Sequence, residues 1–254
     1  MLKVRIIPIM LWNGTTLVKG NKFENEKRSA GSPLTTIKIY NSRDVDEIIF
    51  FDISRNNKII DRDFISSITD CVSVPITIGG GIEKISQMND LFEFGADKIV
   101  INSVIFKDPN IVDEASKIFG SQAITVSIDV KKINQKYECY YNLGNNKSSK
   151  NLKDLLAECV DRGAGEIVIN CIDHDGLMRG YDNDLIKLTS SLVNVPIIAS
   201  GGAGNYEHFY EAYQNGADAF AAASMYHFTE HTPAGAKKYL SKKEVPIREN
   251  FIID

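Results

Sequence analysis

Residues 74–103 read VPITIGGGIEKISQMNDLFEFGADKIVINS, and residues 195–224 read VPIIASGGAGNYEHFYEAYQNGADAFAAAS. The two segments align without a gap at a displacement of 121 residues, close to half of the 254-residue chain. They share a Val-Pro-Ile start, a Gly-Gly pair, a Gly-Ala-Asp triplet and a final serine. A repeat of this period indicates a structure built from two similar halves.

Short apolar runs alternate with amphipathic segments along the rest of the chain. Runs this short and this rich in Ile and Val are typical of parallel strands that are buried on both faces. Eight strand–helix units favour a closed (β/α)8 barrel, or TIM barrel, made of two similar half-barrels and forming one domain over residues 1–254. The eight runs are Val4–Met10, Glu47–Ile53, Val74–Ile78, Lys98–Ile101, Ala123–Ile128, Glu166–Cys171, Pro196–Ala199 and Asp218–Ala223.

Two connections are longer than those in compact domains usually are. Residues 12–32 form a polar stretch that includes Lys19 and is a candidate mobile lid. Residues 131–150 contain the alternating segment Tyr137–Tyr141, which predicts a small hairpin after the fifth strand.

The composition argues against several kinds of partner. The net charge of −4 and the isoelectric point near 5.7 are not those of a protein that binds nucleic acid or an anionic membrane. The four cysteines form no CxxC pair, so we expect reduced thiols and no metal. The apolar start MLKVRIIPIMLWNG is too short to span a bilayer and has no cleavage site. It predicts a first buried strand in a cytoplasmic protein.

Two glycine clusters, Gly79-Gly80-Gly81 and Gly201-Gly202-Ala203-Gly204, lie in register in the repeat, each between a strand and a helix. Glycine lets backbone N–H groups approach an anion closely, and a helix N-terminus adds positive potential. The next strand ends in Asn102-Ser103 in the first copy and in Ala223-Ser224 in the second. The repeat therefore predicts two phosphate sites on opposite sides of the barrel mouth, with tight turns alone as the structural alternative.

Carboxylates follow the predicted strands at the same end of the barrel. Asp129 comes directly after a run that ends at Ile128, and Asp175 lies in the loop Asp173-His174-Asp175-Gly176. Barrel chemistry takes place at this face, where such groups suit general acid–base catalysis on a sugar-phosphate-like substrate. Capping a helix or holding a loop is the simpler role. We predict catalytic roles for Asp129 and Asp175 and a loop role for His174.

Charged residues also stand at the other end of the predicted strands. Arg5, Glu47, Lys98 and Glu166 each lie at the start of an apolar run, so they should meet at the amino-terminal face of the barrel. Two positive and two negative charges can pair around the axis. Such a ring is either a plug of ion pairs that closes the barrel floor or a gate for a small polar molecule, and the residues alone favour neither.

Together these features resemble the HisF family, the cyclase subunit of imidazole glycerol phosphate synthase. The resemblance extends over nearly the whole chain. Related isomerases of histidine and tryptophan synthesis share the glycine turns but are less similar elsewhere. The most specific strings are Phe119-Gly120-Ser121-Gln122-Ala123, Arg162-Gly163-Ala164-Gly165-Glu166-Ile167, Ile172-Asp173-His174-Asp175-Gly176, Gly180-Tyr181-Asp182, Ile198-Ala199-Ser200-Gly201-Gly202-Ala203-Gly204 and His227-Phe228.

The resemblance implies an enzyme that takes ammonia from a glutaminase docked on the amino-terminal face. Ammonia would pass to the opposite face and help to convert an aminoimidazole carboxamide ribonucleotide with two phosphates into imidazole glycerol phosphate and an aminoimidazole carboxamide ribotide. We expect no cofactor. The implied roles are an ammonia gate for Arg5, Glu47, Lys98 and Glu166, catalysis for Asp129 with Lys19 on the mobile loop, one phosphate site at Gly81, Asn102 and Ser103, and the other at Asp175, Gly176, Gly202, Ala203, Ala223 and Ser224.

One position departs from the family pattern. The family uses catalytic aspartates at the ends of the first and fifth strands, and this sequence has Leu11 where the first belongs. Leucine cannot transfer a proton, and general acid–base catalysis supplies about 10²–10⁴-fold in rate. HisF-like paralogues without this aspartate also resemble the chain, and they act with glutaminase-like and amidotransferase proteins to convert a surface sugar's acetamido group to an acetamidino group. We therefore expect such a paralogue acting on a phosphorylated or nucleotide-linked substrate, with a histidine-pathway cyclase and a non-catalytic ammonia conduit as alternatives.

Overall fold

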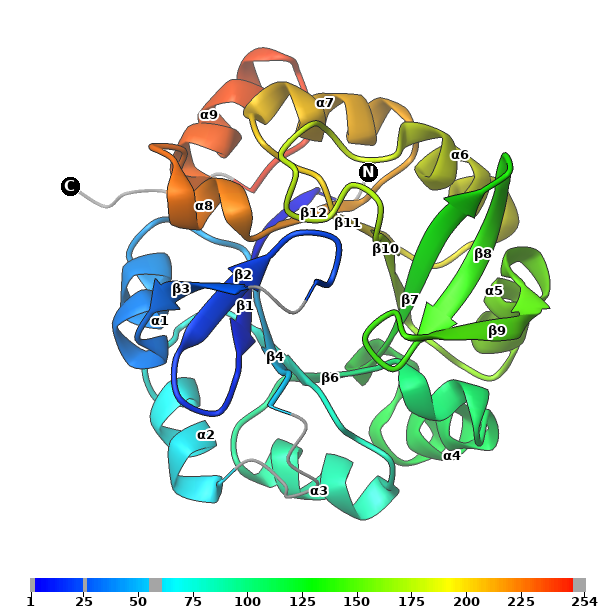
Figure 1. The fold of residues 1–254 in the computed structure, drawn as a ribbon. Coiled ribbons are helices and arrows are strands. Elements are labelled where there is room, and N and C mark those ends of the chain that lie inside the picture. Colours follow the sequence, from blue (N-terminus) through cyan, green and yellow to red (C-terminus); the bar gives the residue numbers. More distant parts are fainter. Residues whose placement is uncertain (1–2, 25–26, 55–60, 249–254) are drawn as a thin grey trace.

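The computed structural model describes residues 3–24, 27–54 and 61–248, which form a closed parallel barrel surrounded by helices (Figure 1). The strands follow one another around the barrel in chain order, and pairing of β7 with β10 completes the circle. This confirms the predicted (β/α)8 barrel. Its strands are β1 (Arg5–Trp12), β4 (Ile48–Asp52), β5 (Ile76–Gly79), β6 (Lys98–Ile101), β7 (Ile124–Ile133), β10 (Glu166–Cys171), β11 (Ile197–Ser200) and β12 (Ala219–Ala222).

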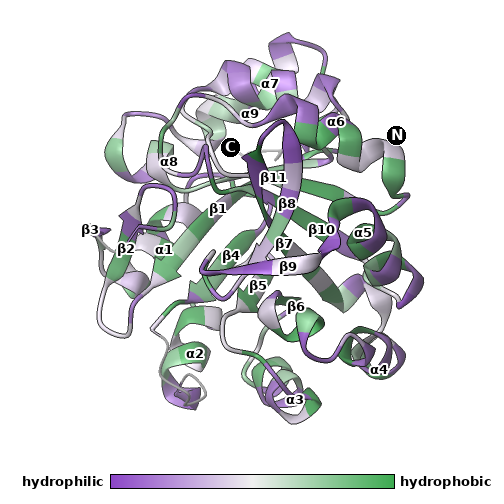
Figure 2. Cartoon of the chain, turned by 45° about the vertical axis from the view of Figure 1, so that its right-hand side comes forward, coloured by the Kyte–Doolittle hydropathy of each residue, from purple (hydrophilic) through white to green (hydrophobic). Residues whose placement is uncertain are grey.

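Helices pack around the outside of the strands, with hydrophilic residues concentrated on their outer turns (Figure 2). Several begin where the sequence supplies a cap: the Asp182 carboxylate accepts a hydrogen bond from the Leu185 N–H, and Ser32 and Thr232 precede a proline at the first helical position. The helices are α1 (Pro33–Asn41), α2 (Arg62–Thr69), α3 (Ile85–Glu93), α4 (Asn110–Phe119), α5 (Leu152–Asp161), α6 (Asn183–Leu192), α7 (Tyr206–Gln214), α8 (Ser224–Phe228) and α9 (Pro233–Lys242), with short 3-10 turns η1 (Ser103–Phe106) and η2 (Ser121–Ala123).

Alternation along the strands produces two apolar layers. Ile6 and Met10 of β1 pack outward in the large cluster between the strands and the helices, whereas Ile7 and Ile9 belong to a smaller cluster of strand residues inside the barrel. Leu11 packs against this inner cluster. A residue at position 11 therefore belongs to the barrel interior rather than to the helix layer.

The two copies of the repeat have the same structure. Helices α3 and α7 begin and end 121 residues apart. The Asp97 carboxylate accepts a hydrogen bond from the Ile76 N–H at 2.8 Å, and Asp218 accepts one from Ile197 at 2.9 Å. These matching contacts support the two half-barrels that the sequence predicts.

Two hairpins stand at the carboxyl end of the barrel (Figure 1). The interpretation of residues 12–32 as a polar loop is incomplete, because β2 (Leu17–Gly20) and β3 (Lys27–Gly31) pair there and Leu17 is fully buried. The predicted second hairpin is confirmed: β8 (Lys136–Tyr141) pairs antiparallel with the extended end of β7 and with β9 (Asn146–Asn151). Gly144, between β8 and β9, lies beside Phe23 of the first hairpin.

The sequence also led to expectations about the cysteines and about membrane-spanning segments. All four cysteines are free thiols, as expected, and Cys139, Cys159 and Cys171 are buried. Within the described ranges, none of the helices combines the length and hydrophobicity that crossing a membrane requires.

Candidate active site

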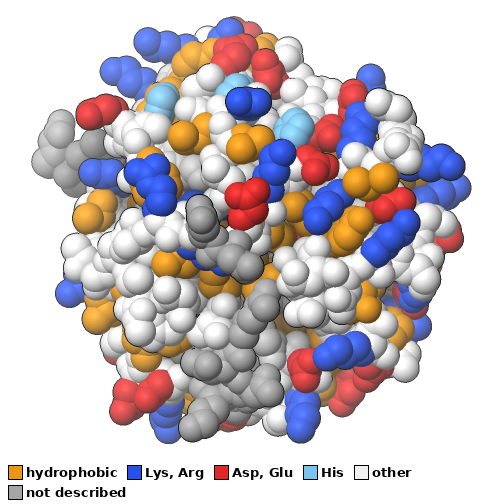
Figure 3. Space-filling view, in the orientation of Figure 1, with side chains coloured by type: hydrophobic (Ala, Val, Ile, Leu, Met, Phe, Trp, Pro, Cys, Tyr) orange, Lys and Arg blue, Asp and Glu red, His pale blue; other side chains and the backbone are white. Residues whose placement is uncertain are grey.

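A cavity of about 820 Å³ opens at the carboxyl ends of the strands. Figure 3 shows this face of the molecule, on which basic and acidic side chains are intermixed above and to the right of the centre. The cavity brings together Lys19, Asp129 and Asp175, which the sequence singled out for catalysis. It also brings together every residue predicted to bind phosphate: Gly80, Gly81, Asn102, Ser103, Gly176, Gly201, Gly202, Ala203, Ala223 and Ser224.

The first glycine turn leaves open space for a ligand. Gly81 has φ +64°, and a Cβ built there would meet nothing within 4 Å, so its backbone borders the cavity directly. Ser103 begins η1 nearby, and its hydroxyl accepts a hydrogen bond from the Asn142 N–H at 3.0 Å. This contact ties the tip of the second hairpin to the predicted phosphate site.

The second turn is held closely against the loop after β10. Gly202 has φ +120°, and a Cβ there would lie 2.1 Å from the Gly180 carbonyl oxygen. The Gly180 N–H in turn donates to the Gly202 carbonyl at 2.9 Å. Glycine at position 202 is therefore required by both conformation and packing. Ser224, which is buried, begins α8 beside this turn.

Each glycine turn lies between a strand and a helix, as the sequence predicts, but neither helix begins at the glycines themselves. Helices α3 and α7 start at Ile85 and Tyr206, several residues beyond the glycines, because the chain must first leave the barrel wall and reach the helix layer. The elements that begin at the cavity are the short ones that start at Ser103 and Ser224. Direct contacts from backbone and hydroxyl groups are thus the main means by which this cavity can hold an anion.

Lys19 and Asp175 form a buried ion pair, although 156 residues separate them. The Lys19 Nζ lies 2.5 Å from Asp175 Oδ2 and also donates to the Gly20 carbonyl at 3.1 Å. The Lys22 N–H donates to the Asp175 carbonyl at 2.9 Å, and Gly176 packs against the Gly20 carbonyl. The first hairpin is therefore fixed to the loop after β10 at the edge of the cavity.

Asp129 is a buried carboxylate between two amides. Asn102 Nδ2 donates to its Oδ2 at 2.7 Å, and Asn170 Nδ2 donates to its Oδ1 at 2.9 Å. Burial raises the pKa of Asp129 to about 6, the charge of Asp175 adds to the shift, and the two amide contacts oppose it. A carboxyl group with this pKa can exchange a proton near neutral pH.

The sequence predicted that Asp129 follows the end of its strand, but Asp129 lies within β7. Strand β7 continues to Ile133 because its partner changes: pairing with β10 ends at Val130, and pairing with β8 begins with Asp129 opposite Tyr140. Sequence reasoning also missed Asn170 as a partner of Asp129. Its signal was a single amide within the otherwise apolar end of the β10 run.

The wall of the cavity at β1 and β4 is formed by the apolar side chains of Ile9, Leu11 and Phe51 and by the Asp52 carboxylate at the end of β4. Leu11 and Phe51 are paired in register on these neighbouring strands, and both line the cavity that contains Asp129. Both also pack against the apolar cluster inside the barrel. Leu11 itself therefore offers no proton donor or acceptor, and neither does its register partner Phe51.

The four charged residues at the strand starts meet in a closed ring. Arg5 contacts Glu47 at 2.7 Å and Glu166 at 2.8 Å, and Lys98 contacts the same two carboxylates at 3.0 Å each. Thr77 donates a further hydrogen bond to Glu47 at 2.6 Å. Burial alone would lower the pKa of Arg5, but the two carboxylates raise it overall, so its guanidinium stays charged between them. The predicted convergence of these residues is correct.

Comparison with known proteins places these features in one family. The family described as "Histidine biosynthesis protein" matches residues 5–232, a span that includes both glycine turns, Asp129 and the charged ring. Relatives that match this chain over nearly their whole length carry the name imidazole glycerol phosphate synthase subunit HisF. The one from Chloroherpeton thalassium is 39% identical over 251 residues, covering 98% of this chain and 100% of the relative. The one from Natranaerobius thermophilus is 41% identical over 253 residues, with the same coverage. The one from Helicobacter hepaticus is 42% identical over 247 residues, covering 96% of this chain and 98% of the relative.

Proposed function

Because the chain belongs to the HisF family of histidine biosynthesis proteins, we propose that it is the synthase subunit of a glutamine amidotransferase complex. In this function a glutaminase partner releases ammonia, and the barrel uses it on a phosphorylated or nucleotide-linked small molecule. The relatives are themselves named as subunits of a synthase. That name and the arrangement of both barrel ends support the proposal.

The two glycine turns are proposed to hold the two anionic ends of the substrate. Gly81 with Ser103 borders one side of the cavity, and Gly202 with Ser224 borders the other. Exposed backbone at Gly81 and hydroxyl groups at both serines suit phosphate oxygens. A substrate held at both ends would lie across the cavity over Asp129, which would act as general acid and base.

The charged ring is proposed as the entry for ammonia. Arg5, Glu47, Lys98 and Glu166 surround the barrel axis at the end opposite the cavity. A closed floor could be made more simply from apolar residues, since charges are costly to remove from water even when they pair. A ring of paired side chains can instead part to admit a small polar molecule. In this proposal the glutaminase docks over the amino-terminal face.

The apolar residue at position 11 supports a more specific proposal about the reaction. With Leu11 beside Phe51, the cavity has Asp129 but lacks the first of the family's two catalytic aspartates. We infer that the chain serves a paralogous complex in which ammonia, with a further amidotransferase subunit, converts a surface or flagellar sugar's acetamido group to an acetamidino group. Such a complex needs ammonia and a bound anionic substrate but not the two-aspartate cyclisation.

A histidine-pathway cyclase is the second candidate function. The relatives named as imidazole glycerol phosphate synthase subunits match from end to end at about 40% identity. Both turns, Asp129 and the ring are also in place. This candidate requires the cyclisation to proceed without the first-strand carboxylate, which in the family shares the proton transfers with the one at the end of the fifth strand. A non-catalytic conduit, the third possibility, would not need the cavity to bind a ligand with two anionic groups.

The Leu11→Asp variant separates the two enzymes. With ammonium salt and the imidazole-pathway substrate, the wild type should turn over very slowly, and the variant should be faster by about 10² or more because a proton-transfer group is restored. The control is Leu11→Asn, because an asparagine side chain has nearly the same shape as aspartate but cannot ionise. Rapid turnover by the wild type would contradict the paralogue and establish the cyclase of histidine synthesis.

A further inference from the structure

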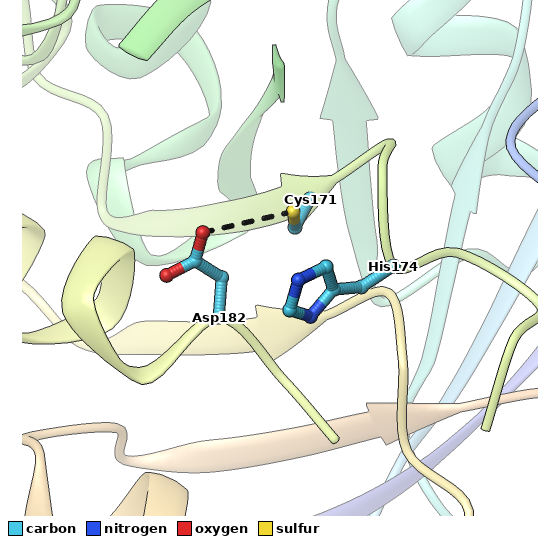
Figure 4. A group of neighbouring side chains, drawn as sticks. All are labelled: Cys171, His174 and Asp182. Carbon is cyan, nitrogen blue, oxygen red and sulfur yellow. Dashed lines mark hydrogen bonds between the residues drawn. The ribbon is translucent and has the colours of Figure 1, made fainter. Parts of the chain in front are cut away.

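Behind the second glycine turn, three side chains from the end of β10 and the loop after it converge on one point. They are Cys171, His174 and Asp182 (Figure 4). One ligand atom from each lies within 4.8 Å of the others. Cys171 and Asp182 are buried, and His174 is half-buried. No step of the proposed reaction uses this cluster.

The hydrogen bonds around the cluster leave one electron-pair donor on each side chain facing inward. His174 Nδ1 contacts the Gly180 carbonyl at 2.9 Å, so in the neutral ring it carries the proton and leaves a lone pair on Nε2. Figure 4 shows one ring nitrogen turned toward Cys171 and Asp182 and the other turned away. This arrangement is common for histidines that bind metals, because the carbonyl contact fixes the ring.

Asp182 is oriented in the same manner. Its Oδ1 accepts hydrogen bonds from the Tyr137 hydroxyl at 2.9 Å and from the Leu185 N–H at 3.0 Å. Its Oδ2 faces the Cys171 sulfur at 4.0 Å. A tyrosine and a helix N-terminus thus hold one carboxylate oxygen and direct the other toward the thiol and the imidazole.

We propose that Cys171, His174 and Asp182 bind a zinc ion. Sulfur, imidazole nitrogen and carboxylate oxygen together are a zinc ligand set, and three protein ligands leave a fourth position for water. In a tetrahedral zinc site these atoms stand about 3.3–3.6 Å apart, so a closure of about 1 Å is enough to form it. A thiolate and a carboxylate balance the charge of the ion, so the buried site is neutral.

A hydrogen-bonded cluster without metal explains the contacts less completely. The imidazole Nε2 and the carboxylate Oδ2 are both acceptors, and the thiol supplies one proton for the two of them. Sulfur is also a weak donor, and its 4.0 Å contact with Asp182 is long. A cation at the centre satisfies all three atoms at once. A second proton on His174 is the competing arrangement, and it would exclude zinc.

The proposed ion would fasten the segment that carries part of the candidate active site. Cys171 ends β10 and Asp182 caps α6, and the loop between them contains Asp175 and Gly176. His174 also packs its Cβ beside the position that a Cβ at Gly202 would occupy. Zinc would therefore hold the Lys19–Asp175 contact and the second glycine turn in place beside the cavity.

Metal binding by the purified chain tests the proposal without substrate or partner. The protein is stripped with a chelator and titrated with zinc in competition with a chromophoric chelator. Cobalt is then used as a spectroscopic probe. We expect one zinc per chain, and with cobalt a thiolate charge-transfer band together with the strong visible bands of a tetrahedral site. Cys171→Ser and His174→Gln should each weaken zinc binding by at least about a hundredfold.

Cys159→Ser is the matched control, because Cys159 is an equally buried cysteine outside the cluster. It should bind zinc as the wild type does. Zinc should also raise the thermal midpoint of the wild type but not that of His174→Gln, whose half-buried position makes loss of the fold a small concern. Absence of stoichiometric zinc in the wild type would overturn the proposal. So would unchanged affinity in both cluster variants, or an equal loss in Cys159→Ser.

Discussion

The Asp129→Asn substitution tests whether the cavity contains a carboxylate whose ionisation opposes folding. Burial raises the pKa of Asp129 from 3.8 to about 6, with Asp175 adding to the shift and the amides of Asn170 and Asn102 opposing it. A difference of roughly two pKa units between the folded and the unfolded chain corresponds to about 3 kcal/mol. Between these pKa values the folded protein keeps a proton that the unfolded chain has released. The free energy of unfolding therefore falls as the pH rises, and the full cost is present above the folded-state pKa.

About 2 of these 3 kcal/mol fall between about pH 4.5 and about pH 7.5. Urea unfolding of the wild type and of Asp129→Asn at both pH values measures this amount, because the variant has no carboxyl group to titrate. Raising the pH should shift the stability difference by about 2 kcal/mol in favour of the variant. Any stability that the variant loses with the amide contacts of Asp129 does not depend on pH, so this loss cancels when the two pH values are compared. The control Leu11→Ile lines the same cavity and should show no such shift. Equal pH dependence in wild type and Asp129→Asn would refute the reasoning.

Four further substitutions test the glycine turns and the ring. Ser224→Asp should weaken binding of a diphosphorylated ligand at least about tenfold in calorimetric titration, because a carboxylate would stand beside a phosphate; unchanged affinity would remove the second turn from the site. Gly202→Ala should lower the free energy of unfolding by more than about 2 kcal/mol, since its Cβ would overlap the Gly180 carbonyl, whereas Gly81→Ala should cost only about 1 kcal/mol of backbone strain. Lys98→Ala should raise the ratio of glutamate released to product formed in the complex with the glutaminase, while activity with free ammonia persists; a wild-type ratio would show that the ring is only structural.

The sequence predicted the barrel because its strands are defined by local patterns. The Val-Pro-Ile start and the glycine turn bracket β5 and β11 within a few residues, and every barrel strand overlaps an apolar run. The pairing partners of the strands could not be predicted in this way, because no local pattern in the sequence encodes them. Strand β2 was hidden in a polar stretch, although Leu17 and Val18 are buried. Strand β7 outlasts its apolar run because β8 replaces β10 as its neighbour.

The candidate site also has one part that the sequence could predict and another that it could not. Residue type and position at strand ends were enough to name Lys19, Asp129 and Asp175, and all three line one cavity. Sequence position could not show that Lys19 and Asp175 are paired, because the contact depends on how the first hairpin folds over the mouth. Asn170 escaped notice for a related reason. An amide in a buried strand has no recognisable pattern until its carboxylate partner on the neighbouring strand is known.

Polar side chains of strand β7 connect the charged ring at one end of the barrel with the cavity at the other. Side chains of β7 alternate between the two faces, and Ile124, Val126 and Ile128 pack outward in the cluster beneath the helices. Thr125, Ser127 and Asp129 therefore point into the barrel. Thr125 contacts Glu166 of the ring at 3.4 Å, whereas Ser127 and Asp129 line the cavity.

This line of polar groups bears on what the proposed conduit could carry. The rest of the interior is mainly apolar, with Ile7, Val168 and Ile198 among its residues. An ammonium ion entering it would lose its hydration at a cost of several kcal/mol without a charged partner along the way. Neutral ammonia loses far less and can exchange hydrogen bonds with the hydroxyls of Thr125 and Ser127. In the proposed function the proton must therefore be left at the ring or before it, and the molecule that reaches Asp129 is already a nucleophile.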